Sequence, residues 1–466
     1  MTSTGQRFRC DHALVDGTIH DHVALTIHGD RIAEVVVGAA DLPASGTRLA
    51  GLVLPGLVNA HSHAFHRALR GRTQRTRGSF WTWRDQMYAV AEVLDPDTCH
   101  ALARAAFGEM ALAGITCVGE FHYLHHAAGG VRYTDANAMG RAIVAAAGEA
   151  GVRLTLLDTL YLTGAVGATP DAPGLTPIQG RFSDGSADEW AARVADLAGH
   201  PGGGEGRSWR VGAAVHSVRA VPPDALSRVA ALVHAGGVVD APAVVHAHVA
   251  EQPDEVEAAR AVHGRTPVQL LADAGLVSST FTAVHGVWLD DHDVRALGAV
   301  GATVCACPTT ERDLADGVVA GDRLDRVGAR LALGSDSHAV VDLLEEARAL
   351  ELDRRLVSRD RGALTASVLM AAATEGGAHS LGWSDAGRIA PGMLADLCVV
   401  GLGSVRLAGL PRTDLLDGVV FAGTAADVTD VMVGGRWTVR DGRHVDLDVP
   451  AELTGAIAAV SGQPRP

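Results

Sequence analysis

Residues 52–63 read LVLPGLVNAHSH, an apolar run that ends in two histidines separated by one serine. A short apolar run followed by polar residues is typical of a buried parallel strand that carries functional side chains at its carboxyl end. Seven further runs of this kind follow along the chain, and Ala- and Leu-rich stretches with helical periodicity lie between them. This alternation predicts an α/β fold, a parallel (β/α)8 barrel of the TIM type.

The positions of the expected barrel elements follow from the same pattern. The expected strands are 52–61, 115–121, 152–157, 211–216, 244–249, 281–285, 302–307 and 331–336. The expected helices include 97–113, 136–150, 223–235, 254–262, 290–297 and 343–356.

The two ends of the chain carry strand and turn signals of their own. Near the N-terminus, two β-rich runs flank the turn Gly29-Asp30, and near the C-terminus two more flank Gly434-Gly435. Neither end is large enough to bury a core alone. We therefore expect a small composite β-sandwich domain formed by residues 1–55 and 389–466, with the barrel occupying residues 56–388.

Composition excludes several classes of protein. The net charge is −15 over 466 residues, and all 39 lysine-plus-arginine positions are arginine. Without lysine there is no Schiff base, no phosphate-loop lysine and no carboxylated lysine to bridge two metals. The acidic charge argues against nucleic acid as a partner, and the absence of a long apolar run argues against a membrane.

The location and assembly of the protein are further expectations. The first residues lack the apolar core of a signal peptide, and the six cysteines are scattered through the chain. We expect a cytoplasmic protein with reduced cysteines that forms a homodimer.

Histidines and one aspartate collect at the expected strand ends. His61 and His63 are two residues apart on an extended segment, so their side chains point the same way. His248 and Asp336 end two other strands, and three imidazoles with one carboxylate leave a position for water, as in hydrolytic metal sites. A single strand histidine is usually structural, but five at strand ends are hard to explain in that way. We expect one divalent metal ion, Zn²⁺, held by His61, His63, His248 and Asp336.

Three motifs resemble the amidohydrolase superfamily. Residues 55–63 resemble its opening metal motif, His248-Val249-Ala250-Glu251 resembles the H-x-x-E of its one-metal deaminase branch, and Gly334-Ser335-Asp336 is similar to its final metal ligand. The resemblance implies that Asp336 accepts a proton from the attacking water and that Glu251 passes a proton to the leaving nitrogen. His285 is expected to orient the tetrahedral centre.

More local motifs resemble the formimidoylglutamate deiminase family, whose members convert N-formimino-L-glutamate to N-formyl-L-glutamate and ammonia in histidine degradation. They are SFWTWR at 79–84, EFHYLHH at 120–126 and HSVR at 216–219. The resemblance implies a small dicarboxylate amidine as substrate, with its carboxylates bound by Arg84, Tyr123, His216 and Arg219. The family often has glutamine three residues after the second metal histidine. Here that position is His66, which can also donate to a carboxylate.

Other interpretations of these residues remain open. Paired arginines suit two carboxylates, but Arg84 could instead stack on the aromatic residues of 80–83. Arg219 could instead form an ion pair with Asp224. Another one-metal aminohydrolase, acting on a guanine-, cytosine- or triazine-like ring, predicts an aromatic slot rather than paired arginines. A catalytically inactive barrel scaffold predicts missing ligands.

Overall fold

The computed structural model describes residues 5–38, 46–75, 77–167, 174–199 and 208–461. A ring of parallel strands lies at its centre, in the order of the sequence. A bridge between Ser62 and Asp336, with a 3.1 Å hydrogen bond from Asp336 N to His61 O, closes the ring and confirms the barrel. The strands are β5 (Leu57–Ser62), β6 (Ile115–His122), β7 (Arg153–Leu160), β8 (Trp209–Val215), β9 (Val245–Val249), β10 (Phe281–His285), β11 (Thr303–Ala306) and β12 (Arg330–Leu333).

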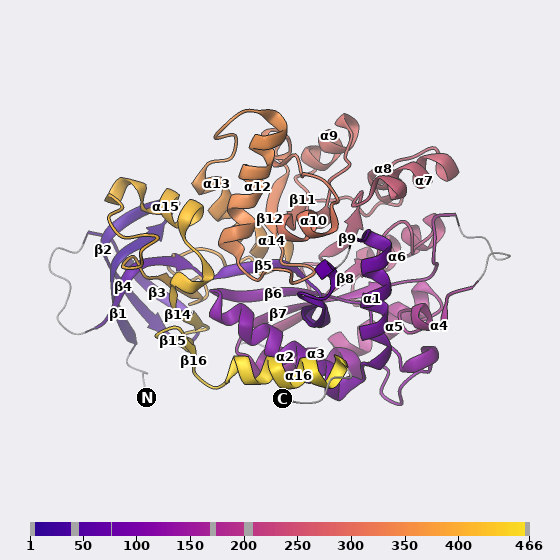
Figure 1. The fold of residues 1–466 in the computed structure, drawn as a ribbon, viewed down its shortest axis with the longest axis horizontal. Coiled ribbons are helices and arrows are strands. Elements are labelled where there is room, and N and C mark those ends of the chain that lie inside the picture. The colour runs from indigo at the N-terminus through magenta and orange to yellow at the C-terminus, as the bar shows by residue number, and fades with distance from the viewer. Residues whose placement is uncertain (1–4, 39–45, 76, 168–173, 200–207, 462–466) are drawn as a thin grey trace.

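Helices cover the outside of the ring (Figure 1). The six expected helices are present, and several begin at capping residues: Asp95, for example, accepts a 2.8 Å hydrogen bond from Thr98 N. They are α2 (Pro96–Leu112), α3 (Ala138–Glu149), α6 (Pro223–Ala235), α7 (Pro253–His263), α9 (Asp291–Ala299) and α12 (Leu343–Ser358). The others are α1 (Phe80–Val93), α4 (Pro177–Gly180), α5 (Ala187–Ala198), α8 (Pro267–Asp273), α10 (Pro308–Leu314), α11 (Gly321–Arg326), α13 (Ala366–Ala371), α14 (Gly377–Ser380), α15 (Leu415–Ala422) and α16 (Val449–Ser461).

A second sheet combines strands from both ends of the chain, as expected. Its order is β16-β15-β14-β13-β4-β1-β2-β3, so the antiparallel pair β13–β4 joins the two ends. The rings of Phe8, in β1, and Trp437, in β15, pack edge to face with their centroids 5.7 Å apart. Three strands lie between β1 and β15 in the sheet, so the sheet curls around an apolar core of its own. The domain boundaries at 55/56 and 388/389 stay a prediction. The strands are β1 (Gln6–Val15), β2 (Thr18–His28), β3 (Arg31–Val36), β4 (Thr47–Pro55), β13 (Leu397–Val400), β14 (Val428–Val433), β15 (Arg436–Arg440) and β16 (Arg443–His444).

The expectation of one strand over 52–61 is wrong. The run divides at Pro55-Gly56: residues 52–55 end β4 of the terminal sheet, and β5 of the barrel begins at Leu57. Gly56 N donates a 2.9 Å hydrogen bond to Asp396 O, and a Cβ at position 56 would lie 2.2 Å from Thr116 Oγ1. Only glycine therefore allows the chain to pass this closely from one sheet to the other.

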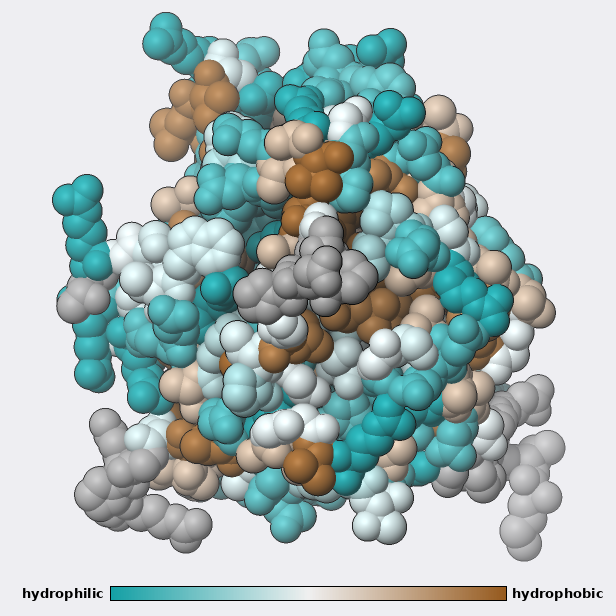
Figure 2. All heavy atoms as spheres, turned by 90° about the vertical axis from the view of Figure 1, so that its right-hand side faces the viewer, coloured by the Kyte–Doolittle hydropathy of each residue, from teal (hydrophilic) through white to brown (hydrophobic). Residues whose placement is uncertain are grey.

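The barrel places its chemistry at the end away from the terminal sheet. In Figure 1 the terminal sheet lies on the left, and α1, α7 and α8 lie on the right. Figure 2 views this right-hand side and shows apolar side chains gathered near the centre of a largely hydrophilic face. Among the described residues, no helix is long and apolar enough to cross a membrane. The six cysteines are buried and unpaired.

Candidate active site

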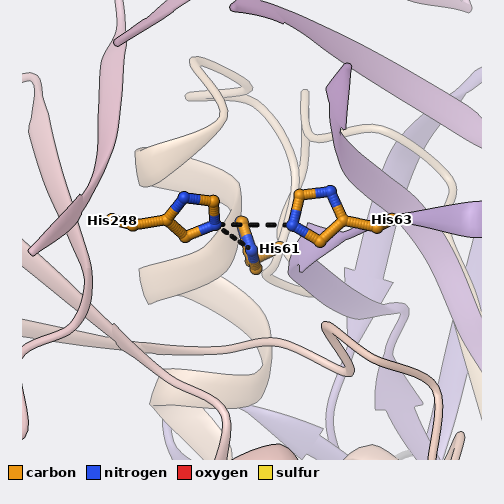
Figure 3. Close-up of side chains that lie close together, drawn as sticks. All are labelled: His61, His63 and His248. Carbon is orange, nitrogen blue, oxygen red and sulfur yellow. Dashed lines mark hydrogen bonds between the residues drawn. The ribbon is translucent and has the colours of Figure 1, made fainter. Parts of the chain in front are cut away.

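Three histidine side chains converge at the carboxyl ends of β5 and β9. His61 is in β5, His63 follows that strand directly, and His248 is in β9. The Nε2 atom of His248 lies 3.2 Å from that of His61 and 3.4 Å from that of His63 (Figure 3). The three rings are buried, so no bulk water separates these atoms.

The histidine geometry fits a divalent metal. Nδ1 of His63 lies 2.9 Å from Phe121 O, and Nδ1 of His248 lies 2.9 Å from His216 O. A carbonyl only accepts, so each Nδ1 carries the proton and each Nε2 turns a lone pair toward the others. Lone pairs at this separation repel unless a cation lies between them. Tetrahedral Zn–N bonds of about 2.0–2.1 Å imply N···N separations of about 3.4 Å, close to those observed.

Asp336 supplies the carboxylate of this site. Its Oδ1 lies 3.4 Å from Nε2 of both His61 and His63, and its Oδ2 lies 3.9 Å from His285 Nε2. Burial alone would raise the pKa of the Asp336 carboxyl, but the surrounding imidazoles lower it. Asn59 holds the preceding residue, because its side chain accepts from Ser335 N at 2.9 Å and donates to Ser335 Oγ at 2.8 Å. The Asp336 carboxylate is therefore ionised and held in position.

A second group of charged residues lies beside Asp336. His285 Nε2 is 3.7 Å from Glu251 Oε1, and His285 Nδ1 is 3.5 Å from Glu311 Oε1. Burial would lower the pKa of His285, but these carboxylates and Asp336 outweigh it and raise the pKa to about 10. The neighbouring carboxylates therefore favour the protonated form of His285. The sequence predicts no role for Glu311, although an acid one turn into a helix after a barrel strand is a signal that could have identified it.

Three residues at this end of the barrel have a left-handed backbone conformation. Ala250, His285 and Asp336 have positive φ angles of 51°, 69° and 40°. Non-glycine residues seldom adopt this left-handed region, and it is enriched at functional sites. Each of the three lies at or just after the end of a barrel strand, where the chain must turn sharply into the loop above the barrel.

A cavity of about 390 Å³ opens above the histidines. Every site residue predicted from the sequence lines it except His61. The walls are largely aromatic, and His66 Nε2 lies 3.2 Å from the Tyr123 hydroxyl. Sequence reasoning missed Tyr161 and Phe182, which come from the loops after β7 and α4. The predicted residues in the lining are His63, His66, Arg84, Tyr123, His216, Arg219, His248, Glu251, His285 and Asp336.

The two arginines of the cavity have different surroundings. Arg84, on α1, stacks on Trp81 with its Cζ atom 4.5 Å from the ring centroid, and within the described residues no carboxylate pairs with it. Stacking is therefore present, and Arg84 also lines the cavity, so its role in carboxylate binding stays a prediction. Arg219 donates from Nη2 to Glu251 Oε2 at 3.2 Å and from Nε to Ser217 Oγ at 3.3 Å. Its ion pair is with Glu251 and not with Asp224.

Comparison with known proteins agrees with this geometry. A crystal structure of an amidohydrolase from Brucella melitensis superposes with a TM-score of 0.88 at 31% identity, covering 98% of this chain and 100% of that one. A zinc-bound adenosine deaminase from Xanthomonas campestris shares the fold, with a TM-score of 0.82 at 24% identity and 98% of each chain covered.

Sequence comparison leads to the same group of proteins. The chain is 39% identical over 412 residues to formimidoylglutamate deiminase of Pseudomonas aeruginosa, covering 85% of this chain and 86% of that one. It is 30% identical over 454 residues to 8-oxoguanine deaminase of the same organism, covering 94% of each. The model of the amidohydrolase family matches residues 52–438. The chain therefore belongs to the amidohydrolase family and is a hydrolase of carbon–nitrogen bonds.

Proposed function

We propose that the chain is a metal-dependent deiminase that hydrolyses N-formimino-L-glutamate to N-formyl-L-glutamate and ammonia. The observation that carries this proposal is the presence of Arg84 and Arg219 in the same cavity as His63, His248 and Glu251. The substrate has two carboxylates and one amidinium, which match two guanidinium groups and one carboxylate. The 39% identity to the formimidoylglutamate deiminase of P. aeruginosa supports the same substrate.

The arginine positions suggest which carboxylate each one binds. Arg219 touches Glu251, at the reacting end of the cavity, so it suits the α-carboxylate, which is attached to the carbon that bears the formimino nitrogen. Arg84 comes from α1 and suits the side-chain carboxylate. Tyr123, His66 and His216 line the same cavity and offer further donors.

The chain's own residues can perform each proton transfer. A divalent metal held by His61, His63, His248 and Asp336 would lower the pKa of a coordinated water toward neutrality. Asp336 can accept the proton of the attacking water through Oδ2, the oxygen that faces His285. Glu251 binds the amidinium nitrogens, takes up the second proton of that water and delivers it to the departing nitrogen.

His285 orients the oxygen that water supplies. Its Nε2 lies 3.9 Å from Asp336 Oδ2 and 3.7 Å from Glu251 Oε1, so it can hydrogen-bond this oxygen as the tetrahedral centre forms. The carbon–nitrogen bond then breaks, ammonia leaves, and the formyl carbonyl remains.

A ring-deaminating activity is the second candidate. The aromatic walls of the cavity suit a flat ring, and 8-oxoguanine deaminase of P. aeruginosa is 30% identical to this chain. The inactive-scaffold alternative predicts missing ligands, and none of the expected ligands is missing. Zinc as the metal and a homodimeric assembly stay predictions.

Ammonia release from a substrate panel, with Arg219→Lys as the variant, tests the proposal. Lysine keeps the charge but loses the planar fork, and losing a charge-assisted hydrogen bond costs about 1.5–3 kcal/mol, or roughly ten- to a hundredfold in kcat/KM for formiminoglutamate. A simple formamidinium that lacks both carboxylates should be a poor substrate for both proteins, and no worse for the variant. An equal fall for both substrates would mean that Arg219 only supports the barrel. Wild-type deamination of guanine or cytosine, with none of formiminoglutamate, would favour the ring-deaminating alternative.

A further inference from the structure

Arg219 contacts the residue that must receive the substrate cation. Its Nη2 donates to Glu251 Oε2 at 3.2 Å, and the side chains are only 17% and 7% exposed. The other oxygen of Glu251 faces His285 at 3.7 Å. One oxygen of Glu251 is therefore paired with a guanidinium, and the other faces an imidazole, before any substrate binds.

This arrangement opposes an amidinium group that arrives alone. The amidinium must lie against Glu251, so it comes close to the guanidinium of Arg219, and like charges repel strongly in a largely buried cavity. The amidinium must also compete with Arg219 for the same carboxylate oxygen. An arrangement that penalises the wrong ligand is a common source of specificity.

A carboxylate on the substrate removes both obstacles. The hydrogen bonds of Arg219 within the described chain use Nε and Nη2, so Nη1 can donate to a substrate carboxylate. Its Cζ atom also lies 5.6 Å from the Phe80 ring centroid, near the aromatic wall of the cavity. A carboxylate bound there neutralises the guanidinium and draws it from Glu251.

We propose that Arg219 couples recognition of the substrate carboxylate to the availability of Glu251. In the empty cavity Arg219 holds Glu251 and repels a lone amidinium, and a carboxylate bound to Arg219 releases Glu251 for proton transfer. The substrate carboxylate is thus an activator of the reaction as well as an anchor. The inference rests on the proposed function, because it takes an amidinium as the reacting group. Arg84 has no such role, since its guanidinium stacks on Trp81 and forms no ion pair within the described residues.

The test supplies the substrate in two pieces. N-methylformamidine provides the amidinium, acetate provides the carboxylate, and ammonia release is followed with the metal-loaded wild-type enzyme. Acetate should raise kcat for N-methylformamidine saturably, by roughly tenfold if one charge-assisted bond is exchanged. This measurement needs no variant, so it does not depend on how a substitution affects folding. No activation at any acetate concentration would overturn the coupling.

Two matched variants separate coupling from anchoring. The kcat of Arg219→Gln for N-methylformamidine should be roughly tenfold higher than that of wild type without acetate. Acetate should not change it further. Arg84→Gln removes the other arginine of the cavity, so it should lose formiminoglutamate activity without any gain on N-methylformamidine. Melting temperature and metal content should show that both variants are folded and loaded. Equal or slower turnover of N-methylformamidine by Arg219→Gln contradicts the inference.

Formiminoglutamate itself distinguishes the two hypotheses. If wild type converts it but acetate has no effect on N-methylformamidine, the proposed function stands and the coupling is wrong. If wild type fails to convert formiminoglutamate, the proposed function is wrong, and the inference is rejected with it.

Discussion

Replacing Glu251 with glutamine should separate proton transfer from the rest of the site. Glu251 Oε2 accepts from Arg219 at 3.2 Å, and an amide oxygen can accept the same bond. The group of nitrogens formed by His61, His63 and His248 does not include Glu251. The variant should therefore fold and bind metal like wild type, and it should lack only the group that carries the proton.

The expected loss is large. Removing a positioned general acid–base group lowers the rate by about two to four orders of magnitude, which corresponds to about 3–5 kcal/mol in activation free energy. Most of the loss should appear in kcat, and KM should also rise because the amide offers no negative charge to the amidinium. Steady-state ammonia release with formiminoglutamate measures kcat and KM, and elemental analysis of the same samples measures metal.

Glu255→Gln is the matched control. Glu255 lies one helical turn further on, is buried, and accepts from Glu251 N at 3.3 Å. Burial and the nearby Glu251 carboxylate raise the pKa of Glu255 to about 7 although Arg219 opposes them. An amide at position 255 can accept the same backbone hydrogen bond, so kcat should fall by less than about tenfold. Near-normal turnover by Glu251→Gln, or an equal loss in both variants, would refute the assignment of proton transfer to Glu251.

Three further predictions concern the metal and the buried polar groups. Elemental analysis should find one divalent ion per chain, and two tightly bound ions would contradict the one-metal site. Arg193 lies 2.8 Å from the carboxylates of Asp158 and Asp184, and Arg193→Met leaves both without a cation. Urea unfolding should therefore show that the free energy of unfolding falls by about 3–5 kcal/mol. Burial alone would raise the pKa of both carboxyls, but Arg193 and nearby histidines lower it. The two carboxylates should therefore contribute fully to the free energy of unfolding above about pH 4, and this contribution should be lost as the pH falls further. The loss with falling pH should be shallower in Arg193→Met. Asn59→Ala leaves Ser335 N and Oγ without their partner. The free energy of unfolding should fall by about 1–3 kcal/mol for each group, and metal binding should weaken. An unchanged free energy of unfolding and an unchanged metal content would contradict this prediction.

Much of the site could be predicted because parallel barrel strands end at one rim. The pattern of apolar runs identifies the strands, and the polar residue after each run then has to lie near the others. His63, His248 and Asp336 come together for this reason although 273 positions separate the first from the last. The two arginines could be assigned to the cavity only through the family resemblance, because nothing in the local pattern near Arg84 or Arg219 indicates where its guanidinium points.

The partner of Arg219 shows why local reasoning fails there. Asp224 is five positions away along the chain, whereas Glu251 is 32 positions away and belongs to the next strand's loop. Parallel strands β8 and β9 are neighbours in the barrel, so their loops meet above it. Contacts between neighbouring loops depend on the order of the strands and on the path of each loop. The spacing of nearby residues in the sequence predicts neither.

By itself the sequence determined the class of fold, the strand ends and the set of metal-ligand residue types, because periodicity and residue chemistry are local properties. Only the tertiary structure decided where the run at 52–61 divides, how the terminal sheet curls, that Glu311 supports His285, and that Arg219 holds Glu251. These features depend on separations of a few ångströms between elements distant in the chain. Such separations are set by register, by packing and by strained backbone at residues such as His285 and Asp336, and no local pattern encodes them.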